Sequence, residues 1–175
     1  YYSQRGRPAR LCCRELLFEL RWPMIVCEKP TGLRLATIDD LDLIVPAHAQ
    51  CAFNDSGVNP LEVDPAAFRE RCARRVEQER TWVWVEDGAL LFKAEIITDT
   101  REVVYIEGVW VNPLERRKGY GLRSMSQLSR TYLMKTESVC LLVNEQFQAA
   151  QAFYKRAGYR LMGYYDTIFL KKDAD

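Results

Sequence analysis

The sequence has a single histidine, His48, and none of its six cysteines lies in a CxxC pair. These shortages exclude the usual structural zinc sites, whose ligands are closely spaced cysteines and histidines. The net charge is only +1 over 175 residues, which argues against bulk electrostatic binding of nucleic acid. No apolar run is long enough to cross a bilayer, and no signal peptide is visible. We therefore expect no metal, no nucleic-acid partner and no membrane association.

The remaining composition is typical of one globular domain with a substantial hydrophobic core. Hydrophobic residues make up 48% of the chain and charged residues 28%, so intrinsic disorder is not expected. The even number of cysteines permits three disulfides, but a domain of this length has no need of them. Reduced thiols and a cytoplasmic location fit the composition better.

The N-terminal stretch carries two separate patterns. Residues 1–10 are basic and are interpreted as a linker or frayed end, with a nucleic-acid-binding arm as the alternative. In residues 11–21 the apolar side chains recur at the spacing i, i+3, i+4 and i+7, which predicts a helix. These side chains are Cys13, Leu16, Leu17 and Leu20. Because such a stripe has to be covered, we expect it to pack on the rest of the chain, on an upstream domain or on a second copy in a homodimer.

The middle of the chain alternates between helical and extended patterns. The predicted elements are a strand at 33–37, a helix at 39–52, a polar loop at 53–60, a helix at 65–79 and strands at 81–87 and 89–98. Asp87-Gly88 between the last two strands is a strong hairpin signal. His48 lies on the apolar stripe of its helix; we interpret it as structural, with a general base as the alternative.

Residues 103–134 combine a strand, a loop and a helix in a way that suits phosphate binding. The apolar strand at 103–111 runs into the basic loop LERRKGYG, which opens directly into an amphipathic helix. Backbone N–H groups at the start of a helix lack partners within it, and glycine lets an anion approach them. The loop matches neither the Walker A nor the GxGxxG pattern. Gly108 inside the strand indicates a β-bulge or a close backbone approach.

The loop resembles that of the GCN5-related N-acetyltransferases, the GNAT family, whose pattern is Arg/Gln-x-x-Gly-x-Gly/Ala. Here it is present as Arg116-Arg117-Lys118-Gly119-Tyr120-Gly121, and LLVN at 141–144 and QAAQAFYKRAGY at 148–159 resemble the same family. The resemblance covers about residues 32–170. It implies a mixed α/β fold with a twisted mixed sheet, in which an antiparallel meander is followed by a parallel strand pair, with helices on both faces. Residues 159–172 are expected to form a final hairpin.

The resemblance also bears on domain organisation. FKAEI at 92–96 and GVWVNP at 108–113 resemble a subgroup of the family whose members carry an additional N-terminal domain. We accordingly assign residues 32–172 to an acetyltransferase domain. Residues 1–31 are assigned to an N-terminal extension or the remnant of an upstream domain.

By the resemblance, acetyl-CoA is the cosubstrate and several of its contacts can be assigned. Residues 116–121 would cradle the pyrophosphate. The strand residues Val109, Trp110 and Val111 would pair with the pantetheine amides in a gap opened by a bulge at Gly108, and an N–H near Val111 would polarise the carbonyl. Asn144 would contact the cofactor. A second asparagine that members often have is replaced here by Phe147.

Two residues are assigned to proton transfer. Strand alternation places Tyr105, Glu107 and Val109 on one face, where burial would raise the pKa of the Glu107 carboxylate towards that of a useful base. In some family members the base lies two residues earlier, at the position of Tyr105, and a structural salt bridge is the alternative role for Glu107. Tyr154 matches the family tyrosine that protonates the leaving thiolate.

These features predict an acyl-CoA-dependent N-acetyltransferase. The acceptor would be a primary amine of a small molecule or a peptide, and transfer would be direct, in a ternary complex. The alternative is a non-catalytic acyl-CoA-binding module that acts as a sensor or scaffold. The two differ in the environment of Glu107, because an ion-paired or averted carboxylate would favour the binding module.

Overall fold

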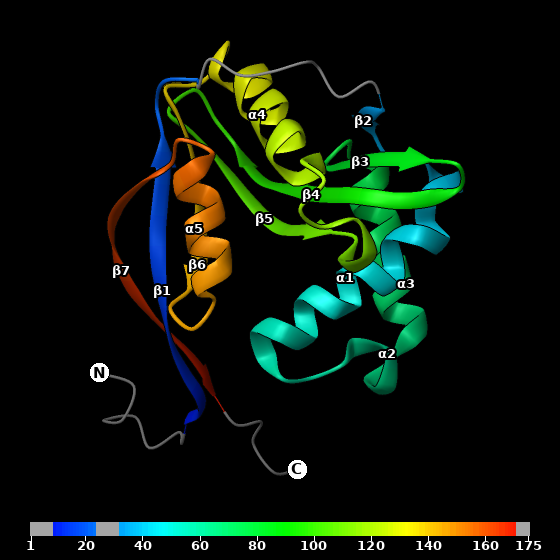
Figure 1. Cartoon of the computed structure of the whole chain (residues 1–175). Helices are drawn as coiled ribbons and strands as arrows, with labels where there is room; N and C mark the ends of the chain where they lie inside the picture. The colour runs from blue at the N-terminus through cyan, green and yellow to red at the C-terminus, as the bar shows by residue number, and fades with distance from the viewer. Residues whose placement is uncertain (1–8, 24–31, 171–175) are drawn as a thin grey trace.

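A seven-stranded mixed sheet forms the centre of the computed structural model, which describes residues 9–23 and 32–170 (Figure 1). The strand order is β2-β3-β4-β5-β6-β1-β7. The strands are β1 Ala9–Leu20, β2 Leu33–Leu35, β3 Thr81–Glu86, β4 Ala89–Asp99, β5 Val103–Val111, β6 Ser138–Asn144 and β7 Arg160–Leu170. The helices are α1 Leu41–Ser56, α2 Pro60–Val63, α3 Pro65–Glu77, α4 Tyr120–Leu133 and α5 Gln148–Arg156, with 3-10 turns at Ile38–Asp40 and Pro113–Glu115.

Strands β3, β4 and β5 form the predicted antiparallel meander. Asp87 and Gly88 connect β3 to β4 with φ angles of 50° and 73°. Positive φ at both central residues is the conformation that two-residue hairpin turns require, which explains the Asp-Gly pair. Strand β5 then pairs in parallel with β6. The mixed sheet predicted from the sequence is therefore confirmed.

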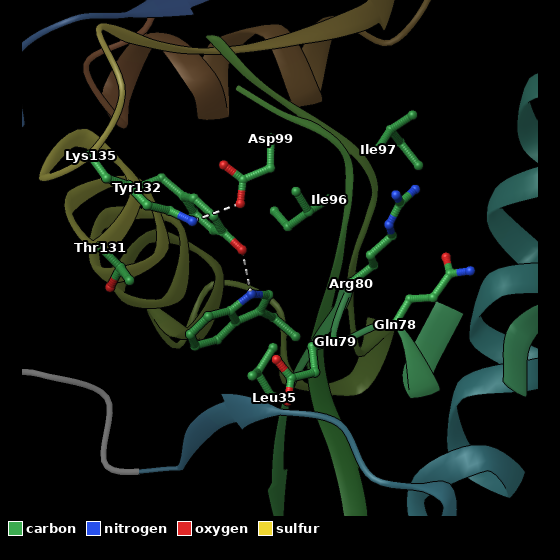
Figure 2. A pocket seen from close by; sticks show the side chains of 11 residues that line it. Leu35, Gln78, Glu79, Arg80, Ile96, Ile97, Asp99, Thr131, Tyr132 and Lys135 are labelled. Atoms are coloured by element: carbon green, nitrogen blue, oxygen red, sulfur yellow. Dashed lines mark hydrogen bonds and ion pairs between the residues drawn. The ribbon is translucent and has the colours of Figure 1, made fainter. Parts of the chain in front are cut away.

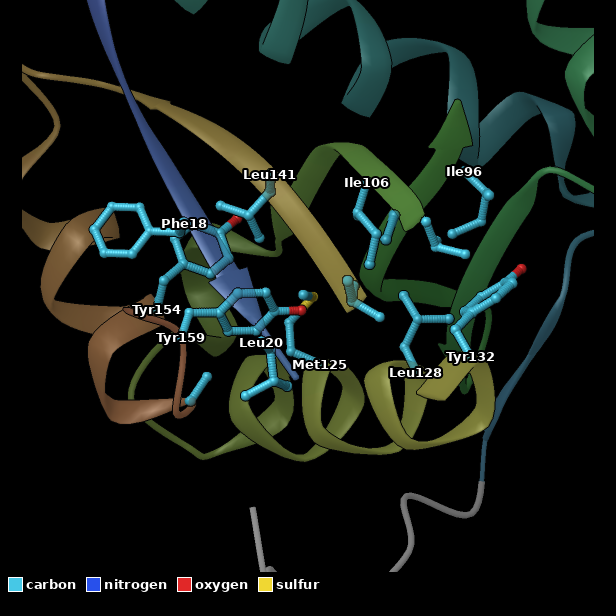
Figure 3. Close-up of a cluster of buried hydrophobic side chains, with 14 of the residues drawn as sticks. Phe18, Leu20, Ile96, Ile106, Met125, Leu128, Tyr132, Leu141, Tyr154 and Tyr159 are labelled. Carbon is cyan, nitrogen blue, oxygen red and sulfur yellow. The ribbon is translucent and has the colours of Figure 1, made fainter. Parts of the chain in front are cut away.

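The larger hydrophobic core lies between the sheet and helices α4 and α5 (Figure 3). Met125 and Leu128 of α4 are fully buried, as the amphipathic pattern of this helix predicts. They pack with Phe18 of β1 and Ile106 of β5, and Tyr154 of α5 belongs to the same cluster. This core holds α4 in place directly behind the loop at 116–121.

Helices α1 and α3 contribute to separate core clusters. Ile44 of α1 and Val76 of α3 pack with Val83 of β3, and Phe68 and Cys72 of α3 pack with α1. Phe68, Cys72 and Val76 therefore form the buried stripe of α3. From Phe92 onwards the residues of β4 alternate, so that Phe92, Ala94 and Ile96 belong to the α4 core while Lys93 and Glu95 meet α1 and α3. The prediction of helices on both faces is also confirmed.

The helix predicted for residues 11–21 is wrong, because this segment forms strand β1. It lies between β6 and β7 and runs antiparallel to both. Leu16, Phe18 and Leu20 point into the core and are at most 5% exposed. The apolar pattern of LLFEL is compatible with a strand as well as with a helix. The segment forms a strand because it can pair with both β6 and β7. Its apolar side chains are thus covered by the chain itself, in the same sheet as the rest of the chain.

Two further expectations are corrected at other places in the chain. The hairpin predicted for residues 159–172 is wrong over the described residues, because β7 is one strand of 11 residues that pairs with β1. The place of a second hairpin strand is taken by β1 from the other end of the sequence. In addition, the first residues of the predicted loop at 53–60 are helical, because α1 continues to Ser56 and ends at Gly57 with φ of 70°.

Residues 1–8, 24–31 and 171–175 lie outside the described residues. The interpretation of residues 1–10 as a linker or nucleic-acid arm therefore stays a prediction. None of the described helices combines the length and the apolar character needed to span a membrane.

Candidate functional site

The loop between β5 and α4 leaves the first amide groups of α4 without acceptors in the helix. Gly119 precedes the helix with φ of 89°, and no side chain caps the helix start. The N–H of Arg123 donates to the carbonyl of Gly119 at 3.0 Å. The N–H groups of residues 120–122 consequently have no intrahelical acceptor. An anion placed here would meet these donors and the positive end of the helix dipole.

Gly119 and Gly121 serve different purposes. A Cβ at Gly119 would approach only Arg123 Nε, at 3.7 Å, but the left-handed φ disfavours any L side chain. A Cβ at Gly121 would lie 2.9 Å from Cγ2 of Val111 and 3.3 Å from the ring of Phe153. Gly119 therefore shapes the loop, whereas Gly121 allows α4 to approach β5 and α5 closely.

The three basic residues of the loop are exposed and differ in their partners. Lys118 Nζ pairs with Glu115 at 2.8 Å, and Arg116 Nε donates to the carbonyl of Val111 at 3.4 Å. Arg117 has a left-handed φ of 67°, and its guanidinium forms no ion pair with any described residue. Lys118 is thus the residue of the three whose charge is balanced by a carboxylate, whereas Arg116 and Arg117 form no ion pair within the described part of the chain.

Tyr120 and Arg123 anchor the start of α4 on the sheet. The Tyr120 ring meets the Trp84 ring edge-on, with centroids 4.8 Å apart. The Arg123 guanidinium lies 5.0 Å from the centroid of each ring. Such aromatic and cation–π contacts fix side chains in place. The side chain of Tyr120 is therefore committed to the protein, and its backbone N–H is the group that faces the loop.

The bulge predicted at Gly108 is confirmed. Glu95 of β4 is opposite Glu107, whereas Lys93 is opposite Trp110, so β5 has one extra residue at this point. Gly108 has φ of 56°, a conformation that favours glycine. The bulge shifts the alternation of β5 by one residue beyond this position.

This shift changes which residues share a face. Val109 and Val111 pack with the α4 core, whereas Trp110 packs with the α1 side of the sheet. Glu107 and Trp110 are opposite the odd-numbered residues of β4 that meet α1 and α3. The prediction that Glu107 and Val109 lie on one face is therefore wrong, because it assumed unbroken alternation.

Strands β5 and β6 separate before the bulge. They pair only over Val103–Tyr105 and Ser138–Cys140, after which β5 stays with β4 and β6 stays with β1. The edge of residues 109–111 that would face β6 has no strand partner. An extended amide-containing ligand could pair with this edge in the way that another strand would.

Glu107 is exposed, so the premise that its carboxylate is buried is wrong. It lies where β5 has already left β6, and it forms no ion pair with another described residue. Burial, and then the neighbouring Glu107, raise the pKa of the Tyr105 phenol, which therefore keeps its proton at neutral pH. Of the two predicted base positions, Glu107 is the one that carries a carboxylate, and the Tyr105 phenol is hydrogen-bonded to it.

Asp55, near the C-terminal end of α1, is a titratable residue that the sequence analysis missed. Asp55 is exposed as a residue, but the surrounding protein partly shields its carboxyl from water. This burial, and then the charges of Glu15 and Glu107, raise the pKa of Asp55 to about 6. A carboxyl with a pKa near neutral pH suits general acid–base chemistry. No local signal marks it, because the charges that act on it come from β1 and β5.

Tyr154 lies on the inner face of α5 and is 7% exposed (Figure 3). Its ring contacts Phe153, Tyr159 and Phe18 at centroid distances of 5.0, 5.8 and 6.2 Å. Burial raises the pKa of its phenol, which therefore holds its proton at neutral pH. No hydrogen bond joins this hydroxyl to another described residue. A general acid must be protonated before it can donate, and the Tyr154 phenol meets this requirement.

Asn144 ends β6 and shapes the turn before α5. Its side-chain Oδ1 accepts from the N–H of Gln146, and its carbonyl accepts from the N–H of Phe147, both at 2.9 Å. The side-chain NH2 group takes no part in this turn. The Asn144 side chain therefore has a fixed orientation at the end of the strand that borders the gap beside β5.

The structural interpretation of His48 is supported by its contacts. The imidazole stacks on Phe68 with centroids 5.3 Å apart. Burial, and then Lys93, lower the pKa of His48 to about 4, so it is neutral at pH 7. Its Nε2 lies 3.2 Å from Arg75 Nη1 and its Nδ1 lies 3.2 Å from Glu95 Oε1.

A cavity of about 360 Å³ lies at the opposite end of α4 (Figure 2). Trp82 Nε1 donates to the Tyr132 hydroxyl at 3.1 Å, and Lys135 pairs with Asp99 at 2.7 Å along its wall. None of the site residues predicted from the sequence lines it. A helix of 14 residues is about 21 Å long, so this cavity is separate from the loop.

A model of a known family matches residues 47–159, and its description is the acetyltransferase (GNAT) family. The match includes β5, the loop, α4, β6 and α5. The chain belongs to the GNAT family. Membership implies acyl transfer from acetyl-CoA. A comparison of this GNAT chain with curated proteins found no match.

Solved structures share the GNAT fold at low sequence identity. An acetyltransferase of the GNAT family from Colwellia psychrerythraea has a TM-score of 0.68 at 13% identity. The match covers 98% of this chain and 61% of the Colwellia chain. A GCN5-related N-acetyltransferase from Sphaerobacter thermophilus has a TM-score of 0.61 at 20% identity, covering 97% and 55%. A predicted acetyltransferase from Clostridium acetobutylicum, solved with acetyl-CoA, has a TM-score of 0.58 at 17% identity, covering 74% and 90%. The chain thus spans 55–61% of the first two proteins.

Three predicted segments of the site converge in this GNAT domain. Gly121 at the start of α4 is in close contact with Val111 of β5 and Phe153 of α5, and Phe153 is adjacent to Tyr154. The charge of Glu107 in β5 contributes to the raised pKa of Asp55. The loop before α4, the unpaired edge of β5 and the titratable residues therefore belong to one region of the fold.

Proposed function

We propose that the chain is an N-acyltransferase that uses acetyl-CoA to acetylate a primary amine. Two consecutive backbone features carry the proposal. Strand β5 separates from β6 after three paired positions. The start of α4, which no side chain caps, comes next along the chain. The first provides an edge for the pantetheine amides, and the second provides donors for a pyrophosphate. Family membership supplies the reaction class.

The cofactor contacts proposed from the sequence fit this backbone. Residues 116–121 would hold the pyrophosphate mainly through main-chain N–H groups, with Arg116 and Arg117 adding positive charge. The backbone of residues 109–111 would lie along pantetheine, and a strand N–H near Val111 would polarise the acyl carbonyl. Asn144 would face the same gap from the end of β6. Bound acetyl-CoA supplies an activated thioester carbonyl.

Proton transfer is assigned to three side chains. The attacking amine is protonated at neutral pH and must lose a proton, for which Glu107 is the proposed base. Asp55, with a pKa of about 6, is a second carboxyl that could receive that proton. Tyr154, with a raised pKa, would donate a proton to the leaving thiolate. The acceptor is proposed to be a small molecule or peptide amine, and the reaction to occur in the cytoplasm by direct transfer.

The proposal is tested by binding first and turnover second. Acetyl-CoA at a hundred times its dissociation constant should stabilise the chain by about 2.7 kcal/mol, which thermal denaturation detects easily. Release of free CoA is then followed with a thiol reagent in the presence of a panel of amines and short peptides. Turnover with any amine supports the enzyme. Binding without turnover on the whole panel favours the sensor or scaffold module, and absence of binding overturns the proposal.

A further inference from the structure

Two opposite charges lie completely inside the protein on one face of β4. Lys93 is 0% exposed and Glu95 is 1% exposed, and their Nζ and Oε1 atoms are 3.1 Å apart. Desolvating two ions costs several kcal/mol each, and an apolar pair of similar size is often at least as stable. The pair therefore calls for an explanation other than the stability of the fold.

Both charges have further partners from other elements. Arg75 of α3 pairs with Oε2 of Glu95, and the neutral His48 of α1 lies against both, with Nδ1 3.2 Å from Lys93 Nζ. Burial alone would raise the pKa of Glu95, but the surrounding cations, Lys93 first, lower it. Glu95 is consequently an anion that balances Lys93. The remaining donor capacity of Lys93 is directed at β5, because its Nζ donates to the carbonyl of Gly108 at 3.1 Å.

Gly108 is the residue at which β5 bulges and leaves its regular alternation. The Gly108 carbonyl is partly buried, and its hydrogen-bond partner is the buried ammonium. The packing is tight, since a Cβ at Gly108 would lie 3.1 Å from Lys93 Nζ and 3.6 Å from His48 Nδ1. Two residues later, Trp110 Nε1 donates to Gln50 Oε1 at 2.6 Å. The bulge is thus held from the side of α1 at two positions.

We propose that Lys93 is a positioning residue for the acyl-CoA slot. By holding the Gly108 carbonyl towards α1, it fixes the bulge and thereby the direction of the backbone amides of residues 109–111, which have no partner in β6. Glu95, which is itself held by Arg75, balances the charge of Lys93 and keeps its side chain in place. This proposal rests on the proposed function, in which those amides bind pantetheine and polarise the acyl carbonyl.

The test removes the ammonium group of Lys93 and keeps a side chain of similar shape. Lys93→Met keeps an unbranched apolar stem, and Glu95 still has Arg75 as a partner. We expect acetyl-CoA affinity, measured by calorimetry, to fall roughly ten- to hundredfold, the loss typical of one charge-assisted hydrogen bond. Amide hydrogen exchange of residues 109–111 should become faster, and KM for acetyl-CoA should rise more than kcat falls. Lys135→Met, which removes the ion pair to Asp99 at the far end of β4, is the matched control and should change none of these.

Each outcome decides the proposal. Wild-type affinity and unchanged exchange at residues 109–111 in folded Lys93→Met would overturn it. Should Lys93→Met fail to fold, the double variant Lys93→Met/Glu95→Gln removes both buried charges, and Arg75, whose side chain is 36% exposed, can turn to solvent. The same readouts then apply. If the wild-type chain binds no acyl-CoA, the proposed function fails, whereas the exchange rates of residues 109–111 still test whether Lys93 fixes the bulge.

Discussion

Glu107 is the residue on which the proposed chemistry depends most, because an ammonium substrate cannot attack until it has lost a proton. We expect Glu107→Gln to lower the rate by about 10²- to 10⁴-fold, the usual range for a general base. The fall in rate towards acid pH should disappear with the carboxylate. Initial rates from pH 5 to 9 measure both. Glu86→Gln, an exposed carboxylate at the end of β3, is the control.

A different outcome would assign the base elsewhere. If Glu107→Gln retains a limb with a midpoint near pH 6, Asp55 is the base, because its pKa is about 6. If the variant keeps the full rate and the wild-type pH profile, Glu107 is not the base. Its exposed position and its effect on the pKa of Tyr105 then play no part in catalysis.

Tyr154 should matter less than Glu107. The thiol that leaves has a pKa comparable to that of cysteine, about 8.5, so its thiolate departs without much help from an acid. We expect Tyr154→Phe to lower kcat by a smaller factor than Glu107→Gln and to leave acetyl-CoA affinity nearly unchanged, since the ring still packs on its aromatic neighbours. Calorimetry and initial rates on the same preparation check this. A loss of affinity as large as the loss of rate would contradict the acid role.

His48 makes a prediction about stability rather than catalysis. Its pKa is about 4 in the folded chain and about 6.5 when unfolded, so the unfolded state binds more protons between these values. The stability contributed by neutral His48 is therefore present above pH 6.5 and is lost as the pH falls towards 4. Urea denaturation at pH 7 and pH 4.5 should show a larger loss for the wild type than for His48→Gln. Equal losses would mean that burial, Lys93 and Arg75 do not lower the pKa of His48 in the folded chain.

At the scale of elements, the loop before α4 offers a comparison between two glycines. Gly119→Ala forces a side chain into a left-handed conformation, which costs about 1–2 kcal/mol, and should weaken acetyl-CoA binding in a folded protein. Gly121→Ala places its Cβ against Val111 and Phe153, so it should destabilise the fold by about 1–3 kcal/mol. Thermal denaturation and calorimetry separate the two effects. Unchanged acetyl-CoA affinity in folded Gly119→Ala would remove the loop from the proposed site.

Strand β1 supplies the second prediction at this scale. Phe18 is fully buried between the neighbouring strands and α5, so Phe18→Ala should lower the free energy of unfolding by about 3–5 kcal/mol. Trp22, just beyond the strand, is 80% exposed, and Trp22→Ala should stay within about 0.5 kcal/mol of the wild type. Chemical denaturation measures both. A small effect at Phe18 would mean that β1 is not an integral strand of the sheet in solution.

The elements that the sequence predicted correctly are those whose cause is local. Asp87-Gly88 favours a hairpin turn by its own backbone preferences, and Gly108 favours a bulge in the same way. The apolar stripe of α4 identifies the face of that helix that is buried. β1 could not be predicted in the same way, because LLFEL satisfies two periodicities and its partners lie more than a hundred residues away. The network around Lys93 was also missed, since its members come from α1, α3 and β4. Two inward charges two residues apart in an apolar strand were the available signal.

At the scale of the whole molecule, the site lies where the sheet divides. β2 to β5 form one continuous antiparallel half, and β6, β1 and β7 form the other, joined only by the three paired positions of β5 and β6. The loop, the unpaired edge of β5 and Tyr154 border this division. A ligand that spans it would connect the two halves, so binding should slow hydrogen exchange in both. Protection limited to the loop would argue against a ligand in the gap.

The position of β1 also has a consequence for how the chain is made. Its two partners, β6 and β7, are the last strands to be synthesised, so β1 leaves the ribosome long before either exists. At ordinary translation rates the interval is on the order of ten seconds. During that time Leu16, Phe18 and Leu20 have no native surface to cover them, which makes this segment a natural binding site for chaperones until the C-terminal strands emerge and enclose it.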